Sequence, residues 1–217
     1  CPHRGLFYTL SKNKVTVMGD IGCYTLGAQK PLDALDAVLC MGASVSGLHG
    51  FNKALAGDNM KTCAVIGDST FMHSGITGLI DIVYNKGIST VIVLDNSITG
   101  MTGHQNNPLN GKTIKGDPTT AVDLEALAKA IGINRIRVVD PFDIKGTRAT
   151  VEEELNADGI NLIRTEIGDK YVLAKLLEKG LTLGGEQSGH IILMDKATTG
   201  DGILSAIVLA NMIKAEG

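Results

Sequence analysis

Five short apolar runs in this chain lack the alternation of apolar and polar residues that marks a half-exposed strand. Each of them ends in Gly, Asp or Asn: 14–20, 37–42, 61–68, 90–96 and 136–140. Candidate helices lie between the runs, over 43–56, 72–85, 122–131 and 146–156. Strands that are buried on both faces lose their alternation, and helices connect parallel strands. The pattern therefore predicts an α/β fold, with a parallel sheet of five or six strands covered by helices on both faces.

The pattern of the sequence changes after about residue 158. The segments that follow predict an edge strand, a hairpin around a Gly-rich turn and a capped amphipathic helix, over 161–165, 181–195 and 198–214. We therefore predict two domains, 1–158 and 159–217, of which the second is a small α/β appendage.

Composition excludes several classes of partner. The chain has 217 residues with 20 Lys and Arg against 23 Asp and Glu, a formal net charge of −3. We therefore expect neither nucleic acid nor an anionic membrane surface as a partner.

The longest apolar runs, VIVL and AIVLA, are too short to span a bilayer. The four cysteines have no short metal-binding spacing, which favours a reducing, cytoplasmic setting. The first residue, Cys1, is not Met, so we expect a fragment or a processed product.

Two strand ends carry residues that suit a metal and a phosphate. Asp68 and Asn96 follow runs that predict neighbouring parallel strands, and both offer the oxygen ligands that Mg²⁺ prefers. Ser69 and Thr70 lie where a helix begins, so free backbone N–H groups there can meet a phosphate, and Gly67 allows a close approach. A Gly-Asp-Ser sequence is also an ordinary strand-to-helix turn in which Asp or Ser caps the helix. The residues alone leave both interpretations open.

Residues 67–105, GDSTFMHSGITGLIDIVYNKGISTVIVLDNSITGMTGHQ, resemble the thiamine diphosphate motif, in which Gly-Asp and a small residue are followed by Asn at about this distance. More closely, residues 1–158 resemble the thiamine-diphosphate-binding domain of the large subunit of indolepyruvate:ferredoxin oxidoreductase. The matching segments are CPHRGLFYTL, GDIGCYTLGA, CMGASVSGLHG and MTGHQ. The resemblance implies oxidative decarboxylation of an aryl 2-oxo acid, with thiamine as the electron sink and ferredoxin as the electron acceptor.

The resemblance also implies site residues. Mg²⁺ would be bound by Asp68, Asn96 and the backbone carbonyl of Ile98. The diphosphate would be held by Gly67, Ser69 and Thr70. Two neighbouring turns would line the site with Gly19, Asp20, Ile21, Gly22, Cys23, Gly42, Ala43 and Ser44. No catalytic residue is assigned.

The resemblance further implies parts that this chain lacks. In the family, the glutamate that activates the aminopyrimidine lies on a separate domain, and no segment here matches that domain. We therefore expect a missing pyrimidine-binding domain or second subunit as partner, a homo-oligomer, and cofactor binding without turnover by this chain alone. Relatives hold an iron–sulfur cluster through a cysteine pair and a cysteine at the position of Cys23. Cys1 and Cys23 alone cannot hold a [4Fe–4S] cluster, which takes four thiolates, so we expect none here.

The other cysteines and the histidines have structural interpretations. Cys40 and Cys63 lie in apolar runs and are expected as small core residues. His49 is expected to pack against the sheet, and His73 to cap or pack its helix. Residues 97–121 contain no periodic segment, and such long irregular stretches are usually functional or disordered. His104 lies there, either close to substrate or as a solvated loop residue.

Residues 168–214 resemble a different family, the third domain of bacterial phosphoglucosamine mutase. The resemblance implies that Glu186 and Ser188, in the GEQSGH loop, contact sugar hydroxyls. The alternative is a polar hairpin turn without a ligand. Neither the phosphoserine loop nor the fourth domain of that family is matched. The seam between the two resemblances falls between Asp158 and Arg164. The chain is then a natural recombinant, a designed chimera or an assembly error, and a sugar-phosphate-binding fragment or a chimera without a ligand stays the alternative function.

Overall fold

The computed structural model describes residues 3–55, 60–166, 176–185 and 191–194, together with residues 208 and 211. The chain divides into two compact units, His3–Ile167 and a unit that contains Gly168–Gly217. None of the helices in the described ranges is long and apolar enough to cross a membrane.

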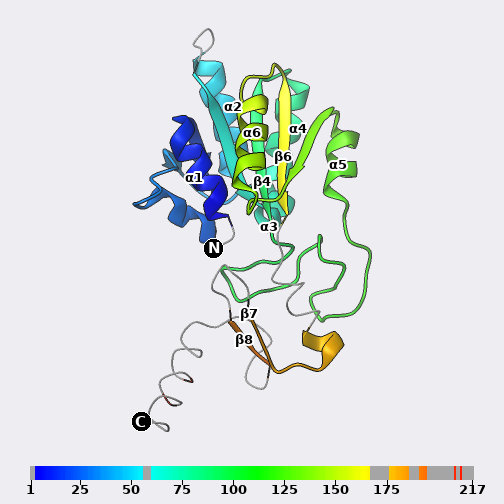
Figure 1. Ribbon diagram of the computed structural model, residues 1–217. Helices are drawn as coiled ribbons and strands as arrows, with labels where there is room; N and C mark the ends of the chain where they lie inside the picture. The colour runs from blue at the N-terminus through cyan, green and yellow to red at the C-terminus, as the bar shows by residue number, and fades with distance from the viewer. Residues whose placement is uncertain are drawn as a thin grey trace. The chain divides into compact units, whose positions relative to one another are not determined.

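The first unit is built on a six-stranded sheet in which every pair of neighbouring strands is parallel (Figure 1). The strands are β1 (Thr16–Gly19), β2 (Ala37–Val38), β3 (Thr62–Gly67), β4 (Ser89–Asp95), β5 (Arg135–Val139) and β6 (Ile160–Glu166). Their order across the sheet is β2-β1-β3-β4-β6-β5. The predicted α/β class and parallel sheet are confirmed.

The expectation that residues 161–165 form an edge strand is wrong. Strand β6 lies between β4 and β5, with Leu162 paired to Val91 on one side and to Ile136 on the other. The reason lies in the side chains: Leu162 and Ile163 point to opposite faces and are both fully buried. Strand β5, with Arg137 on its length, occupies the edge instead, where charged side chains discourage further pairing.

Helices cover both faces of the sheet, as the sequence predicts (Figure 1). One face packs against α1 (Arg4–Asn13) and α6 (Ile144–Glu154), and the other against α2 (Ala43–Ala54), α4 (Ile76–Tyr84) and α5 (Leu124–Ile131). Successive residues of β4 serve the two cores, since Ile92 and Leu94 face the first and Val91 and Val93 the second. All four are at most 2% exposed, which explains the missing alternation.

Helix α1 is the element that the sequence pattern does not predict. Its buried residues are Leu6, Phe7, Thr9 and Leu10. Their spacing of three and four is the helical signal that could have revealed it. Shorter helical turns complete the unit: η1 (Cys23–Ala28), α3 (Asp68–Thr70) and the π-helical turn η2 (Phe71–Gly75).

Helix α5 begins at a side-chain cap that can be tested. The Asp123 carboxylate accepts a hydrogen bond from the Ala126 N–H at 2.9 Å. Replacing Asp123 by Ala should lower the free energy of unfolding by about 1 kcal/mol, because it leaves a helix N–H without its partner. Urea unfolding measures the loss. Asp123→Asn keeps an accepting oxygen and should retain most of the stability, so equal losses in the two variants would contradict the cap.

The second unit contains the predicted hairpin. Strand β7 (Leu183–Gly185) pairs antiparallel with β8 (Ile191–Leu193), with Gly184 opposite Ile192. The predicted sugar ligands Glu186 and Ser188 lie outside the described residues, and so does almost all of the predicted helix 198–214.

Candidate functional site

The predicted metal residues lie at the carboxyl ends of two central strands of the sheet, β3 and β4. Gly67 of β3 pairs with Leu94 of β4, so Asp68 and Asp95 leave the two strands at the same level. Asn96 follows directly. Across the gap between the two turns, the hydroxyls of Ser69 and Thr99 are 2.7 Å apart and share a hydrogen bond. The fold thus brings the Gly-Asp-Ser turn and the turn after β4 into contact.

Asp68 is a buried carboxylate whose side chain is held by the long loop. It is 2% exposed, and Nδ2 of Asn107 donates to its Oδ2 at 2.9 Å. Burial, and next the nearby charge of Asp95, raises the pKa of Asp68 to about 7. A divalent cation at this carboxylate would offset the desolvation of its charged form. The environment of Asp68 therefore fits a metal ligand.

The loop that follows β4 is held by its own polar groups. Asn96 is half-buried, and its Oδ1 accepts the Ile98 N–H at 3.3 Å. Asp95 is fully buried: its Oδ1 accepts the N–H and the Oγ–H of Ser97, at 2.7 and 2.9 Å. Its Oδ2 accepts a hydrogen bond from Nε of Arg164 at 2.7 Å and forms an ion pair with Nη2 at 2.6 Å. Asn96 and Ile98 are thus the two sequence neighbours of Ser97, which is hydrogen-bonded to the buried carboxylate of Asp95.

Asp20 performs a structural task that the sequence does not reveal. Its carboxylate accepts backbone N–H groups of Ile21 and Gly42 at 2.8 Å, and of Ser44 at 3.1 Å. It therefore holds the turn after β1 on the N-terminus of α2 and occupies N–H groups that could otherwise meet an anion. Oγ of Ser44, which is buried, has no hydrogen-bond partner among the described residues.

Gly67 has a packing reason as well as its predicted role in binding the diphosphate. A Cβ at this position would lie 2.8 Å from Cε1 of Tyr24, whose ring covers the glycine. The Tyr24 hydroxyl donates to the Ile21 carbonyl at 3.2 Å, and burial raises the pKa of this hydroxyl above its ordinary value. Tyr24 thus ties the turn after β1 to the end of β3.

The remaining predicted residues lie at the same end of the sheet, and they differ in how far they are exposed to solvent. Buried are Gly19, Gly42 and Thr70; half-buried are Ile21, Gly22, Ala43, Ser69 and Ile98. Cys23 is exposed. It lies beside the loop after β4, since a Cβ built on Gly100 would lie 3.9 Å from Sγ of Cys23 and 3.6 Å from Nδ2 of Asn96. Cys1 lies outside the described residues.

The described part of the chain contains no group of three or more His, Cys, Asp and Glu side chains that could hold a metal ion. The predicted Mg²⁺ set has another composition: one carboxylate from Asp68, one amide oxygen from Asn96 and one backbone carbonyl from Ile98. Such a set relies on phosphate oxygens and water to complete the shell, as Mg²⁺ sites commonly do.

Two expectations about the other cysteines have different outcomes. Cys63 is fully buried in β3, as expected, and burial raises the pKa of its thiol. Cys40 is exposed, so its assignment to the core is wrong. The apolar run continues past the end of β2 into a turn, where Leu39 and Met41 are exposed as well.

His49, His73 and His104 lie on three different elements of the described chain. His49 is buried in α2, with Nε2 4.0 Å from Oδ2 of Asp81 on α4. His73 is exposed in η2, and His104 is half-buried in the long loop.

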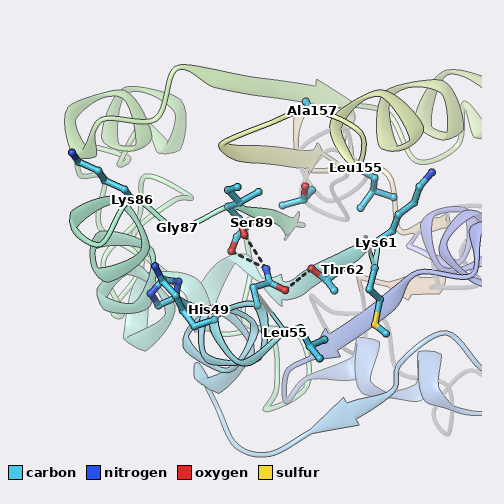
Figure 2. A pocket seen from close by; sticks show the side chains of 14 residues that line it. His49, Leu55, Lys61, Thr62, Lys86, Gly87, Ser89, Leu155 and Ala157 are labelled. Atoms are coloured by element: carbon cyan, nitrogen blue, oxygen red, sulfur yellow. Dashed lines mark hydrogen bonds between the residues drawn. The ribbon is translucent and has the colours of Figure 1, made fainter. Parts of the chain in front are cut away.

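A cavity of about 380 Å³ opens at the opposite end of these strands, beside the amino ends of β3 and β4 (Figure 2). Its polar floor is paired internally. Asn52 donates to the Ile88 carbonyl at 2.9 Å and to Oγ of Ser89 at 3.3 Å, and it accepts from Oγ1 of Thr62 at 2.8 Å. The cavity is therefore separate from the predicted cofactor residues, which lie at or after the carboxyl ends of strands.

Sequence reasoning missed Asp95, Arg164, Asn107 and Tyr24. Asp95 had a signal, since a carboxylate at the end of a buried apolar strand needs a partner in the folded chain. Arg164 and Asn107 had none, because their partners are far away in sequence.

Comparison with known families bears directly on the residues at the carboxyl ends of the strands. The model of the thiamine pyrophosphate enzyme C-terminal TPP-binding domain matches residues 20–165, which include every predicted metal and diphosphate residue. The chain belongs to this family. A second model, the alpha/beta/alpha domain III of phosphoglucomutase/phosphomannomutase, matches residues 115–217. Both matches include 115–165, so the predicted seam falls inside a segment that both models match.

Individual relatives confirm both resemblances. The chain is 40% identical over 177 residues to the indolepyruvate oxidoreductase subunit IorA of Pyrococcus abyssi, covering 75% of this chain and 27% of that protein. It is 45% identical over 91 residues to phosphoglucosamine mutase of Thermotoga maritima, covering 41% of this chain and 21% of the mutase. The chain therefore spans about a quarter of the length of the first relative and about a fifth of the second.

The fold of the TPP-binding family is also found by structural comparison. The 2-oxoglutarate:ferredoxin oxidoreductase of Magnetococcus marinus superposes with a TM-score of 0.63 at 17% identity, over 76% of this chain and 61% of that one. At this identity the likeness shows the fold alone.

Proposed function

We propose that residues 1–158 bind thiamine diphosphate through Mg²⁺, as the cofactor domain of an oxidoreductase that decarboxylates indolepyruvate or a similar aryl 2-oxo acid. The observation that carries the proposal is the buried carboxylate of Asp68, set beside the Asn96 turn in a TPP-binding domain. Asp68, Asn96 and the Ile98 carbonyl hold the metal. Gly67, Ser69 and Thr70 hold the diphosphate.

Each of these residues has a limited task. Asp68 supplies the negative charge to the metal, and Asn107 fixes the orientation of its carboxylate. Ser69, tied to Thr99, keeps the diphosphate turn and the metal loop at a constant separation. Bound thiamine diphosphate supplies the electron sink for decarboxylation, which protein side chains cannot provide.

The same edge of the sheet carries exposed apolar side chains. Leu26, Leu39, Met41 and Met101 all follow carboxyl ends of strands and are 52–72% exposed. Such a surface favours a docked pyrimidine-binding domain or second subunit, in a homo-oligomer, which would cover the thiamine rings. Turnover and transfer of electrons to ferredoxin belong to that assembly, in the cytoplasm. This chain alone binds cofactor without turnover and without an iron–sulfur cluster.

Calorimetric titration of the purified chain with thiamine diphosphate, with and without Mg²⁺, tests the proposal. We expect saturable binding that requires Mg²⁺, at an affinity reduced by the absence of the proposed pyrimidine-binding partner from the titration. No binding at millimolar ligand, or equal binding in EDTA, would overturn it.

A second candidate is sugar-phosphate binding by residues 159–217, favoured by the 45% identity to phosphoglucosamine mutase. Glu186 and Ser188 would contact the sugar hydroxyls. Titration with glucosamine phosphate tests this candidate in the same calorimeter. Heat from the sugar phosphate alone would favour it, and no heat from either ligand would favour a chimera without a ligand.

A further inference from the structure

We propose that Arg164 is a positioning residue for the metal loop: through the buried Asp95 it fixes the turn that presents Asn96 and the Ile98 carbonyl to Mg²⁺. The inference rests on the proposed function for the metal, but the geometry of the turn stands without it. Arg164 lies on β6, and Asp95 is the last residue of β4.

The contact between the two side chains is strong and enclosed. Nε of Arg164 donates to Oδ2 of Asp95 at 2.7 Å, Nη2 forms an ion pair with the same oxygen at 2.6 Å, and Asp95 is fully buried. A buried carboxylate without its cation would be left uncompensated. Nη1 of Arg164 also lies 3.5 Å from Oε1 of Glu125, in the first turn of α5, which holds the guanidinium from a second side.

The other oxygen of Asp95 fixes the turn itself. Oδ1 accepts both the N–H and the Oγ–H of Ser97. Ser97 has a φ of +54°, a left-handed conformation that residues other than glycine rarely adopt. Two hydrogen bonds to one fixed oxygen stabilise it. Because Asn96 and Ile98 flank Ser97, the direction of the Asn96 side chain and of the Ile98 carbonyl depends on this conformation.

Arg164 is thus not one of the proposed metal ligands and acts on them through Asp95 and Ser97. Outer partners of metal ligands commonly change metal affinity by 10–100-fold when they are removed. The arginine geometry is also specific, since a single lysine ammonium cannot keep the Nε hydrogen bond and the Nη2 contact with Asp95 together with the Nη1 contact with Glu125.

The test compares Arg164→Met and Arg164→Lys with a matched control. Arg135 also pairs with a buried carboxylate, since Nε and Nη2 donate to the two oxygens of Glu154 at 3.0 Å, but it lies outside the proposed metal site. We expect Arg164→Met to weaken Mg²⁺-dependent thiamine diphosphate binding about 10- to 100-fold, and Arg164→Lys less. Arg135→Met should lower the unfolding temperature and leave this affinity unchanged.

Hydrogen exchange in the chain without cofactor gives an independent readout. The Ser97 amide should exchange faster in both Arg164 variants than in the wild type, and at the wild-type rate in Arg135→Met. Unchanged exchange at Ser97, or wild-type affinity in a folded Arg164→Met, would overturn the inference. If the wild type itself does not bind the cofactor, the proposed function is wrong, and the exchange rates still decide whether Arg164 positions the turn.

Discussion

Replacing Asp68 by Asn should abolish Mg²⁺-dependent binding of thiamine diphosphate and, at the same time, stabilise the chain without cofactor above neutral pH. Binding is lost because the amide removes the only carboxylate from the proposed Mg²⁺ set. Stability is gained because burial and the charge of Asp95 raise the pKa of Asp68 from 3.8 to about 7, so ionised Asp68 disfavours the folded state.

The direction of the pH dependence follows from this pKa. Between about pH 4 and pH 7 the folded chain retains a proton on Asp68 that the unfolded chain has released, so stability falls as the pH rises through that window. Well above pH 7, where Asp68 is ionised in the folded chain too, the penalty on the free energy of unfolding is roughly 4 kcal/mol. The gain in Asp68→Asn should therefore be largest at pH 8 and smaller at pH 5.

Urea unfolding in EDTA at the two pH values measures the gain, and calorimetry measures the binding. Glu186→Ala, in the mutase-like segment, should leave Mg²⁺-dependent binding unchanged. Retained binding in Asp68→Asn would show that the metal assignment is wrong. A gain in stability that is equal at pH 5 and pH 8 would show that the charge of Asp68 is not its cause.

Replacing Gly42 by Ala should destabilise the chain by roughly 2–4 kcal/mol and weaken cofactor binding with it. Gly42 has a φ of +85°, and a Cβ there would lie 2.1 Å from Oγ and 2.6 Å from Cβ of Ser74. The Gly42 N–H also donates to Asp20. The start of α2 would have to move away from η2, which directly follows the diphosphate turn.

Gly50, in the same helix, is the matched control. It is exposed, and a Cβ there would have no neighbour within 4 Å. Gly50→Ala should stabilise the chain by about 0.5–1 kcal/mol through helix propensity, and it should leave binding unchanged. Thermal and urea unfolding of the two variants measure the contrast. Similar stability in Gly42→Ala and Gly50→Ala would contradict the close packing at the start of α2.

The elements of the parallel sheet were predictable because their signal is local. Strands β3 and β4 are apolar on consecutive residues, and only burial on both faces explains such a pattern. The helices between them follow from their own periodicity. Where the pattern was weaker, as in β2 and the turn that contains Cys40, an apolar run continued past the strand and its burial was overestimated.

The predicted metal and diphosphate residues came from a short motif, and in the fold they lie at the carboxyl ends of β3 and β4. The motif did not reveal what holds them there. Asn107 reaches Asp68 from an irregular loop, and Tyr24 covers Gly67 from the turn after β1. The carboxylate of Asp20, a residue predicted to line the site, accepts hydrogen bonds from the backbone N–H groups of Gly42 and Ser44 at the start of α2.

The sequence by itself determined the class of the fold, the strand ends that carry the Gly-Asp-Ser turn and Asn96, and the two family resemblances. These depend on neighbouring residues and on spacing, which a single chain displays directly. Only the tertiary structure decided that β6 lies inside the sheet and that Arg164 meets Asp95 across 69 positions. Strand order is set by how both cores are filled, and no local pattern encodes which buried charge will find which partner.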